Sequence, residues 1–189
     1  NQTVVFPAKT MIAAAMNPCK CGFFPDLGKC RCTPTQIRRY LNRVSGPFLD
    51  RIDIGVEVPR QDLGMMASEK SIDEGSFPQT EQRNSSAVMR ARVMEARARQ
   101  EKRFADESIS YNSQMTRRQI EKYCRLSGED VVFLEKVERH QGISARGHGK
   151  ILKVARTLAD LDGQAEIGRT QLAEAIGFRS FEKKYWGSL

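Results

Sequence analysis

Apolar residues recur at helical spacing through most of the chain after residue 84, and this pattern predicts helices. The predicted helices span 85–104, 115–124, 128–140, a segment that Ser144 caps, and 170–178. In the helix that Ser144 caps, the core stripe is expected at Ile151, Val154, Ala155, Leu158 and Leu161. The pattern therefore predicts an all-α domain over residues 84–189.

Two segments in the first third of the chain have the pattern of strands. The run over residues 11–16 is continuously apolar and ends at Asn17 and Pro18, which is typical of a strand buried on both faces. Residues 52–58 alternate with period two, which predicts a second strand. Its apolar face is expected to consist of Ile52, Ile54, Val56 and Val58. Two strands lack the partners that a parallel sheet requires, so the rest of the sheet is expected upstream of Asn1.

The order of these elements predicts three parts of the chain. Residues 1–59 are expected to be the C-terminal part of an α/β domain, with a helix that begins at Thr33 and Pro34 and ends before Gly46. Gly, Ser, Asp, Gln and Pro dominate residues 60–83 without a sustained period, which predicts a linker or mobile loop. The helical domain follows over 84–189.

Composition narrows the class of protein only slightly. The 189 residues include 31 Lys and Arg against 23 Asp and Glu, for a formal net charge of +8. That excess is compatible with a nucleic-acid partner, and equally with a solvated basic face. No stretch approaches the roughly 20 apolar residues of a membrane span. Four of the 5 cysteines lie in one short segment, a distribution that favours a reducing compartment over a secreted disulfide scaffold.

The cysteine segment has the spacing of a metal site. Its pattern is Cys19-x-Cys21-x8-Cys30-x-Cys32, within residues 17–33. Four thiolates suit a structural, tetrahedral Zn²⁺ and leave no open position for catalysis. An iron–sulfur cluster, four reduced thiols and two disulfides are the alternatives that the spacing leaves open.

Three polar residues are candidates for contacts with phosphate. Asn17 follows the first predicted strand, where ligands bind in open α/β sheets, although an Asn before Pro is also a common turn former. Arg51 precedes the second strand and can reach a phosphate across a subunit boundary, or pair with Asp50 or Asp53. Arg146 lies in the first turn of its helix, where a cation opposes the macrodipole unless an anion completes the site. A solvated basic face is the other interpretation of Arg146.

Several motifs of the chain, in order, resemble the magnesium-chelatase-like AAA+ ATPase family of bacteria, of the ComM/YifB type. The resemblance covers nearly the whole chain and is weakest over residues 61–83. It rests on Phe6-Pro7-Ala8, Met16-Asn17-Pro18-Cys19-x-Cys21-Gly22, Cys30-x-Cys32-Thr33-Pro34, Tyr40-Leu41-x-Arg43-x-Ser45-Gly46-Pro47-x-Leu49-Asp50-Arg51-Ile52-Asp53-Ile54, Ser144-Ala145-Arg146 and Ile151-Leu152-Lys153-Val154-Ala155-Arg156-Thr157-x-Ala159-Asp160-Leu161.

The resemblance implies a role for each candidate residue. Asn17 is similar to the sensor 1 residue, Arg51 to the arginine finger and Arg146 to the sensor 2 arginine of a helical lid. The chain contains no G-x-x-x-x-G-K-[ST] phosphate loop, and the family's Walker segments would lie upstream. The fold that the resemblance implies is therefore an α/β remnant of a AAA+ P-loop domain with a four-Cys zinc knuckle, followed by an all-α lid.

The same resemblance implies a function for the complete protein. Members of the family assemble as rings, usually hexamers, and bind ATP and Mg²⁺. Members of the ComM type are implicated in DNA branch migration during natural transformation, in the bacterial cytoplasm. By itself the chain is expected to be inert as an ATPase. A non-catalytic zinc module that binds nucleic acid through the basic helix 85–104, and a chelatase-like subunit, are the alternative functions.

Overall fold

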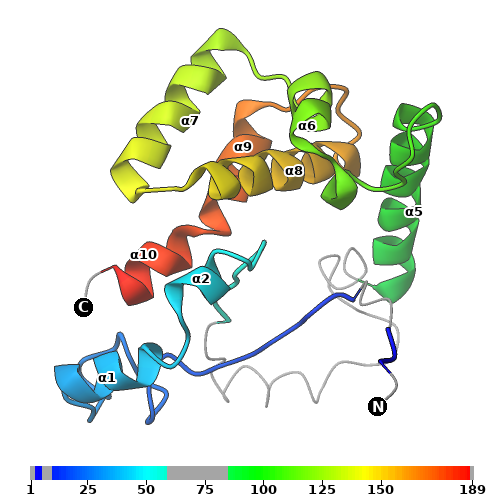
Figure 1. Ribbon diagram of the computed structural model, residues 1–189. Helices are drawn as coiled ribbons and strands as arrows, with labels where there is room; N and C mark the ends of the chain where they lie inside the picture. The colour runs from blue at the N-terminus through cyan, green and yellow to red at the C-terminus, as the bar shows by residue number, and fades with distance from the viewer. Residues whose placement is uncertain (1–2, 6–9, 59–84, 188–189) are drawn as a thin grey trace, which may run out of the picture. The chain divides into compact units, whose positions relative to one another are not determined.

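Helices make up the regular structure of the described chain (Figure 1). The computed structural model describes residues 3–5, 10–58 and 85–187. The chain divides into two compact units, Asn1–Ser45 and Gly46–Ser188, and each is described by itself. The predicted linker over 60–83 lies outside the described residues, so the predicted three-part division stays a prediction. In the described ranges no helix is both long and apolar enough to cross a membrane.

The described residues of the Asn1–Ser45 unit form one helix, α1 (Pro34–Leu41), which begins as predicted. Thr33 and Gln36 form a reciprocal capping box, and Pro34 takes the first helical position, where no N–H is needed. The helix ends at Leu41, earlier than the sequence indicates. There the Arg43 N–H donates to the Tyr40 carbonyl at 3.3 Å, and the tighter turn satisfies the last carbonyls of the helix.

Neither predicted strand forms in the described residues, so the two strand predictions are wrong for this structure and the α/β part is not shown. Residues 10–16 are irregular, and Met11 and Ile12 are 93% and 72% exposed instead of buried. Residues 52–58 are irregular as well, with Val56 and Val58 largely exposed. A strand needs a neighbour to accept its hydrogen-bond ladder. In the described part of the chain the Gly55 N–H donates instead to the Phe178 carbonyl at 2.9 Å.

In residues 46–58 and 85–187, which the structure describes, all regular structure of the Gly46–Ser188 unit is helical. Its elements are α2 (Gly46–Leu49), α5 (Ser86–Arg103), the 3-10 turn η2 (Asn112–Gln114), α6 (Arg117–Tyr123), α7 (Gly128–Gln141), α8 (Ala145–Leu161), α9 (Arg169–Gly177) and α10 (Ser180–Trp186). The predicted helices after residue 84 are confirmed as α5 to α9, whereas α10 was not predicted. Ser85, Thr116, Ser127 and Ser144 cap α5 to α8 by accepting a backbone N–H from the first turn.

The core of this unit surrounds α8, which packs against α5, α6, α9 and η2 (Figure 1). Ile151 and Ala155 are fully buried, as predicted. The buried stripe is rotated relative to the prediction, because Val154 and Leu158 are only partly buried, while Leu152 and Ala159 lie inside. The rotation brings two charged residues of α8 into the interior.

Arg156 and Asp160 are these two residues, and they are 2% and 0% exposed. The Asp160 carboxylate accepts hydrogen bonds from Arg103 and Asn112, each at 2.8 Å, and from Arg156 at 3.1 Å. Arg156 also donates to the carbonyls of Gln164 and Ala165, at 2.7 and 2.8 Å. These bonds join α5, η2, α8 and the segment that leads to α9. Burial acts to raise the pKa of Asp160, but the bonds from Arg103 and Asn112 and the nearby Arg156 charge hold it below its usual range.

Asp160→Ala is expected to lower the free energy of unfolding of this unit by about 3–5 kcal/mol, because it leaves two guanidinium groups in the interior without their carboxylate. Asp162→Ala is the matched control, since the Asp162 side chain is 42% exposed and makes only surface contacts in the described residues: a 3.9 Å pairing with Arg92 and a hydrogen bond from Gln171 at 2.9 Å. A surface pair of this kind contributes about 1 kcal/mol or less. Urea unfolding followed by circular dichroism measures the free energy of unfolding of both variants. Equal decreases in the two variants would contradict a structural role for the hydrogen bonds around Asp160.

Candidate functional site

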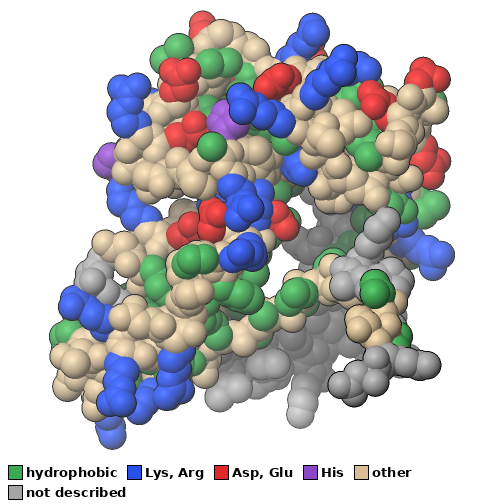
Figure 2. Space-filling view, viewed as in Figure 1, with side chains coloured by type: hydrophobic (Ala, Val, Ile, Leu, Met, Phe, Trp, Pro, Cys, Tyr) green, Lys and Arg blue, Asp and Glu red, His purple; other side chains and the backbone are tan. Residues whose placement is uncertain are grey.

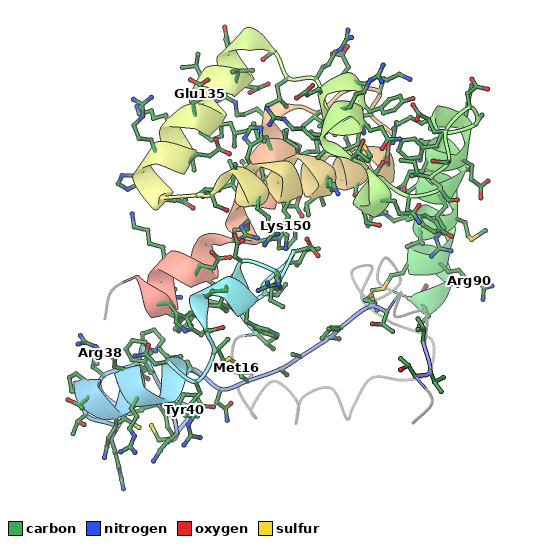
Figure 3. The ribbon with its side chains drawn as sticks, in the orientation of Figure 1. Met16, Arg38, Tyr40, Arg90, Glu135 and Lys150 are labelled. Carbon is green, nitrogen blue, oxygen red and sulfur yellow. The ribbon has the colours of Figure 1, made fainter. Side chains whose placement is uncertain are left out.

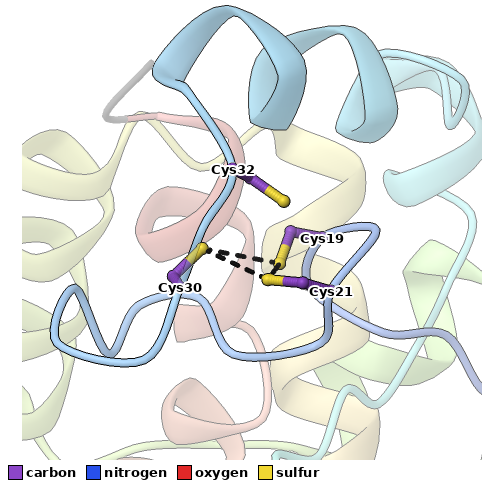
Figure 4. A group of neighbouring side chains, drawn as sticks. All are labelled: Cys19, Cys21, Cys30 and Cys32. Carbon is purple, nitrogen blue, oxygen red and sulfur yellow. Dashed lines mark hydrogen bonds between the residues drawn. The ribbon is translucent and has the colours of Figure 1, made fainter.

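The four predicted metal ligands lie together in the Asn1–Ser45 unit (Figure 4). Their sulfur atoms all lie within 4.8 Å of one another. Cys19 Sγ is 3.4 Å from Cys21 Sγ and 3.8 Å from Cys30 Sγ, and the sulfur atoms of Cys21 and Cys30 are 3.6 Å apart. All four cysteines are free thiols, so the two-disulfide alternative does not describe this structure.

The backbone around the cysteines forms tight turns that bring the two pairs together. Gly22 has φ +77°, a left-handed conformation that glycine adopts without strain. Its N–H donates to the Cys19 carbonyl at 3.1 Å, while the Phe24 N–H approaches Cys19 Sγ at 3.5 Å. The Cys30 N–H donates to the Asp26 carbonyl at 2.8 Å, which closes the loop between the pairs. The Cys-x-Cys spacing is therefore compatible with a common centre.

The thiols differ in acidity because they share one small volume. A hydrogen bond from the backbone of Phe23 lowers the pKa of Cys21 to about 6. The pKa of Cys30 is raised to about 12: a hydrogen bond from the Cys32 backbone acts against the rise, but burial and the Cys21 and Cys19 sulfurs outweigh it. A cation placed among the sulfurs would lower the pKa of each thiol, because it favours the thiolate form of all four cysteines.

The sulfur separations fit a tetrahedral metal. With Zn–S bonds of about 2.3 Å, the edges of the sulfur tetrahedron are about 3.8 Å long, close to the separations among Cys19, Cys21 and Cys30. The sulfur of Cys32 lies within 4.8 Å of the other three. Cys19 is fully buried, and the described residues of this unit bury only two others, Ile37 and Leu41. A unit with so small a core would gain most of its stability from an ion bound at its centre. The cysteines can therefore hold a metal ion in a structural role.

Asn17 belongs to the same unit and immediately precedes the metal site. Its side chain is exposed, and no described residue forms a side-chain hydrogen bond with it. The irregular backbone before Pro18 does not end a strand, so the structure gives the amide no sheet edge to occupy. Its predicted contact with phosphate stays a prediction.

Arg51 lies two residues after α2 in the other unit and is exposed. Its Nη1 donates to the Pro47 carbonyl at 2.6 Å, which holds the side chain along the turn. The alternative pairing with Asp50 or Asp53 is not formed in the described residues, because Asp53 pairs with Lys150 at 3.2 Å. Figure 3 labels Lys150 on α8. The guanidinium of Arg51 thus keeps most of its donors free of carboxylates.

Asp50 holds the turn of Arg51 against the start of α8. It accepts a hydrogen bond from the Ser144 hydroxyl at 3.0 Å and pairs with Arg146 Nη1 at 3.6 Å. Arg146 is in the first turn of α8, and its side chain is 62% exposed. The anion that a cation at this position requires is supplied here by Asp50. The structure brings Arg51 and Arg146 to one region of the unit, on either side of this carboxylate.

Arg179 is a residue of this region that the sequence does not reveal. It is 5% exposed, donates to the Ile52 carbonyl at 2.8 Å, and bonds Glu182. Its partner Ile52 lies 127 positions away, so no local pattern marks it. Nearby, Gly55 must be glycine, because a Cβ there would lie 2.2 Å from the ring of Phe181. These contacts fasten residues 50–55 to the junction of α9 and α10.

A groove of about 1210 Å³ lies beside these arginines, along α6 and α8. Arg51, Arg117, Arg146, Lys150 and Lys153 line it with positive charge, and Asp53 and Glu121 supply the acidic groups. The remaining lining is mainly apolar and includes Ile54, Leu152 and Phe178. A groove with this lining can take an anionic ligand or an anionic part of a larger molecule.

In its described residues the chain thus has a unit with four clustered cysteines, followed by a helical unit in which the exposed Arg51 and Arg146 lie beside one groove. The family model "Magnesium chelatase, subunit ChlI" matches residues 1–66, and "Magnesium chelatase, subunit ChlI C-terminal" matches residues 83–179. The chain belongs to this magnesium-chelatase-like family, and to its ComM/YifB type, which confirms the resemblance seen in its motifs.

Relatives of this type align with almost the whole chain. Competence protein ComM of Haemophilus influenzae is 39% identical over 181 residues, which are 95% of this chain and 32% of ComM. YifB of Escherichia coli is 39% identical over 180 residues, 95% of this chain and 33% of YifB. YifB of Salmonella typhimurium is 38% identical over the same shares. The chain spans about a third of the length of these relatives.

Proposed function

We propose that the chain is the C-terminal part of a ring-forming AAA+ ATPase, with three phosphate-directed residues: Asn17 as sensor 1, Arg51 as arginine finger and Arg146 as sensor 2. The ring, a hexamer, hydrolyses ATP with Mg²⁺ and couples hydrolysis to DNA remodelling in the bacterial cytoplasm. Membership of the family supports the proposed class of ATPase. The roles of the phosphate-directed residues are supported by the guanidinium of Arg51, which is exposed and pairs with no carboxylate in the described residues.

The position of Arg51 suits action in trans. Charge develops on the phosphoryl oxygens during transfer, and a guanidinium offered by a neighbouring subunit stabilises it. Arg51 stands on a short turn that Asp50 and the Arg179–Ile52 bond hold in place. The backbone that carries the Arg51 side chain is therefore held in place. In the ring, its guanidinium would contact the phosphate of ATP bound to the neighbouring subunit.

Arg146 suits action within its own subunit through an exchange of anions. Its pair with Asp50 is long and its side chain is 62% exposed, so breaking the pair costs about 1 kcal/mol or less. A phosphate oxygen accepts a stronger, charge-assisted hydrogen bond from the same guanidinium. Binding of ATP would thus move Arg146 from Asp50 to the nucleotide, and α8 with the rest of the lid would follow.

The Asn1–Ser45 unit and residues 46–59 are, in this proposal, the end of the α/β core. The exposed apolar side chains of residues 11–16 and 52–58 would be covered when upstream strands add the missing ladder partners. Residues 84–189 form the lid. Zn²⁺ held by Cys19, Cys21, Cys30 and Cys32 braces the loop after Asn17 and takes no part in the chemistry.

Arg146→Ala in the full-length protein is expected to raise KM for ATP by about tenfold or more, because loss of a charge-assisted hydrogen bond costs about 1.5–3 kcal/mol. Steady-state ATP hydrolysis measures the effect. Arg139→Ala is the matched control, since Arg139 is exposed on α7 and lies outside the groove lining. A full-length protein without ATPase activity would overturn the proposed function, and equal KM values would overturn the sensor 2 role.

A further inference from the structure

Basic residues outnumber acidic ones in the Asn1–Ser45 unit far more strongly than in the rest of the chain. Its described part carries one acidic residue, Asp26, and six basic residues, all of them exposed. The six are Lys20, Lys29, Arg31, Arg38, Arg39 and Arg43. Figure 2 shows Lys and Arg side chains gathered over α1, and Figure 3 labels Arg38 there.

Structural roles account for only part of this charge. Lys20, Lys29 and Arg31 flank the cysteines and would offset the thiolates of a metal site. Lys29 also lies 3.9 Å from Asp26, the ion pair that the described residues of this unit form. At the end of α1, the helix dipole favours Arg38 and Arg39 in the last turn, but Arg43 lies two residues beyond the helix. In the described residues none of these three arginines forms an ion pair.

The outer face of α1, which we define to include Arg43 in the turn that follows it, has the chemistry of a surface for phosphates. Ile37 and Leu41 turn inward and are buried, which leaves the exposed face to Arg38, Arg39 and Arg43 with polar neighbours. A protein partner usually requires an apolar centre in its interface, and the described part of α1 fully exposes no apolar side chain larger than Pro34. Four of the six cations are arginines, whose planar donors match phosphate oxygens.

We propose that the outer face of α1, together with the basic loop of the cysteine site, is a nucleic-acid surface that holds the phosphate backbone of DNA. The metal site then has a second task, because it fixes the basic loop beside the helix that carries the arginines. The binding is independent of sequence, since it uses phosphates alone. The inference rests on the proposed function only for the choice of DNA as the ligand.

The test compares two triple variants of the 189-residue chain in its metal-loaded form. One is Arg38→Gln with Arg39→Gln and Arg43→Gln on the outer face of α1. The other is Arg90→Gln with Arg92→Gln and Arg97→Gln, which removes the same charge from the exposed helix α5. Fluorescence anisotropy with a short labelled DNA duplex gives Kd at salt concentrations from about 50 to about 200 mM.

The α1 variant is expected to reduce the slope of log K against log salt by about 2.7, at about 0.9 for each phosphate that is no longer neutralised. Over this fourfold rise in salt, the wild type would lose about 40-fold more affinity than the α1 variant. The α5 variant is expected to keep the wild-type slope. Each single Gln substitution should lower the slope by about 0.9, which provides a test if the triple variant loses its metal or its helicity.

Three results would overturn the proposal. One is an equal or larger reduction of the slope in the α5 variant, which would place the DNA on that helix. Another is absence of binding by the wild-type chain at low salt. The third is competition by polyglutamate as strong as competition by unlabelled DNA of equal charge, which would indicate an acidic protein partner. No ATP is hydrolysed in this assay, so its failure and a failure of the ATPase tests are separate results.

Discussion

Arg51→Ala in the full-length protein is expected to lower kcat for ATP hydrolysis by about 10³-fold or more, with little change in oligomeric state. An arginine finger contributes on this scale because it meets charge that develops only in the transition state. In the described residues the Arg51 side chain makes one hydrogen bond, to the Pro47 carbonyl, so its removal should not unfold the turn. Arg51→Lys should recover only part of the activity, since an ammonium lacks the planar, forked donors.

A mixing experiment distinguishes action in trans from action in cis. If Arg51 serves the neighbour's nucleotide and Arg146 serves its own, Arg51→Ala and Arg146→Ala subunits should complement each other in mixed rings. Some interfaces then combine an intact Arg51 from one subunit with an intact Arg146 from the next. Arg118→Ala, an exposed arginine on α6, is the control. Unchanged kcat in Arg51→Ala would refute the finger, and inactive mixtures would refute its action in trans.

The helices could be predicted because their signals are local. Thr33, Ser85, Thr116, Ser127 and Ser144 each accept a backbone N–H within the first turn that follows. A cap of this kind depends on residues two or three positions away, and the sequence displays it directly. The cysteine site was also predictable, because Cys19 and Cys32 lie close enough in sequence for one loop to join them.

The strands could not be settled in the same way, because a strand depends on a distant partner. Residues 52–58 have the alternation of a strand, yet the Gly55 N–H bonds the Phe178 carbonyl, more than a hundred positions later. The partner of Arg146 was missed for the same reason. Asp50 neutralises it from 96 positions away, while the sequence suggested only that an anion was needed.

The buried charges of α8 show a different limit. Arg156 and Asp160 follow the buried Leu152 at intervals of four residues, a spacing that places all three on the same face of the helix. The sequence therefore contained the information that they face inward. Hydrophobicity assigns charged residues to the outside, and this assumption shifted the predicted stripe toward Val154 and Leu158. The bonds from Arg103, Asn112 and Arg156 make burial of the Asp160 charge tolerable.

Removing the metal is expected to unfold the Asn1–Ser45 unit and leave the Gly46–Ser188 unit folded. Binding of a structural Zn²⁺ by four thiolates contributes about 10–16 kcal/mol, whereas the described core of this unit consists of Cys19, Ile37 and Leu41. The other unit has a core of its own around α8. After chelation, limited proteolysis with mass spectrometry should show cuts within residues 17–45 and continued protection of 85–187.

A Cys→Ser substitution at Cys19 and at Cys124 distinguishes a metal ligand from an ordinary buried thiol. Cys19→Ser should reduce bound zinc from about one equivalent to a trace, because three thiolates and a hydroxyl bind the ion poorly. Cys124→Ser places the hydroxyl in the core of the other unit, where it should cost about 1–3 kcal/mol and leave the zinc content unchanged. Elemental analysis also distinguishes zinc from the iron of a cluster. Less than about half an equivalent of metal in the wild type would count against the site.

The pH dependence of metal retention provides an independent check of the ligand set. In the metal-free protein the pKa of Cys30 is about 12, so binding at neutral pH must displace its proton. Metal affinity should therefore fall as pH is lowered and rise as pH is raised, for as long as a ligand thiol is protonated in the free protein. Competition with a chelator between about pH 6 and 9 measures this. An affinity independent of pH would mean that Cys30 is not a ligand.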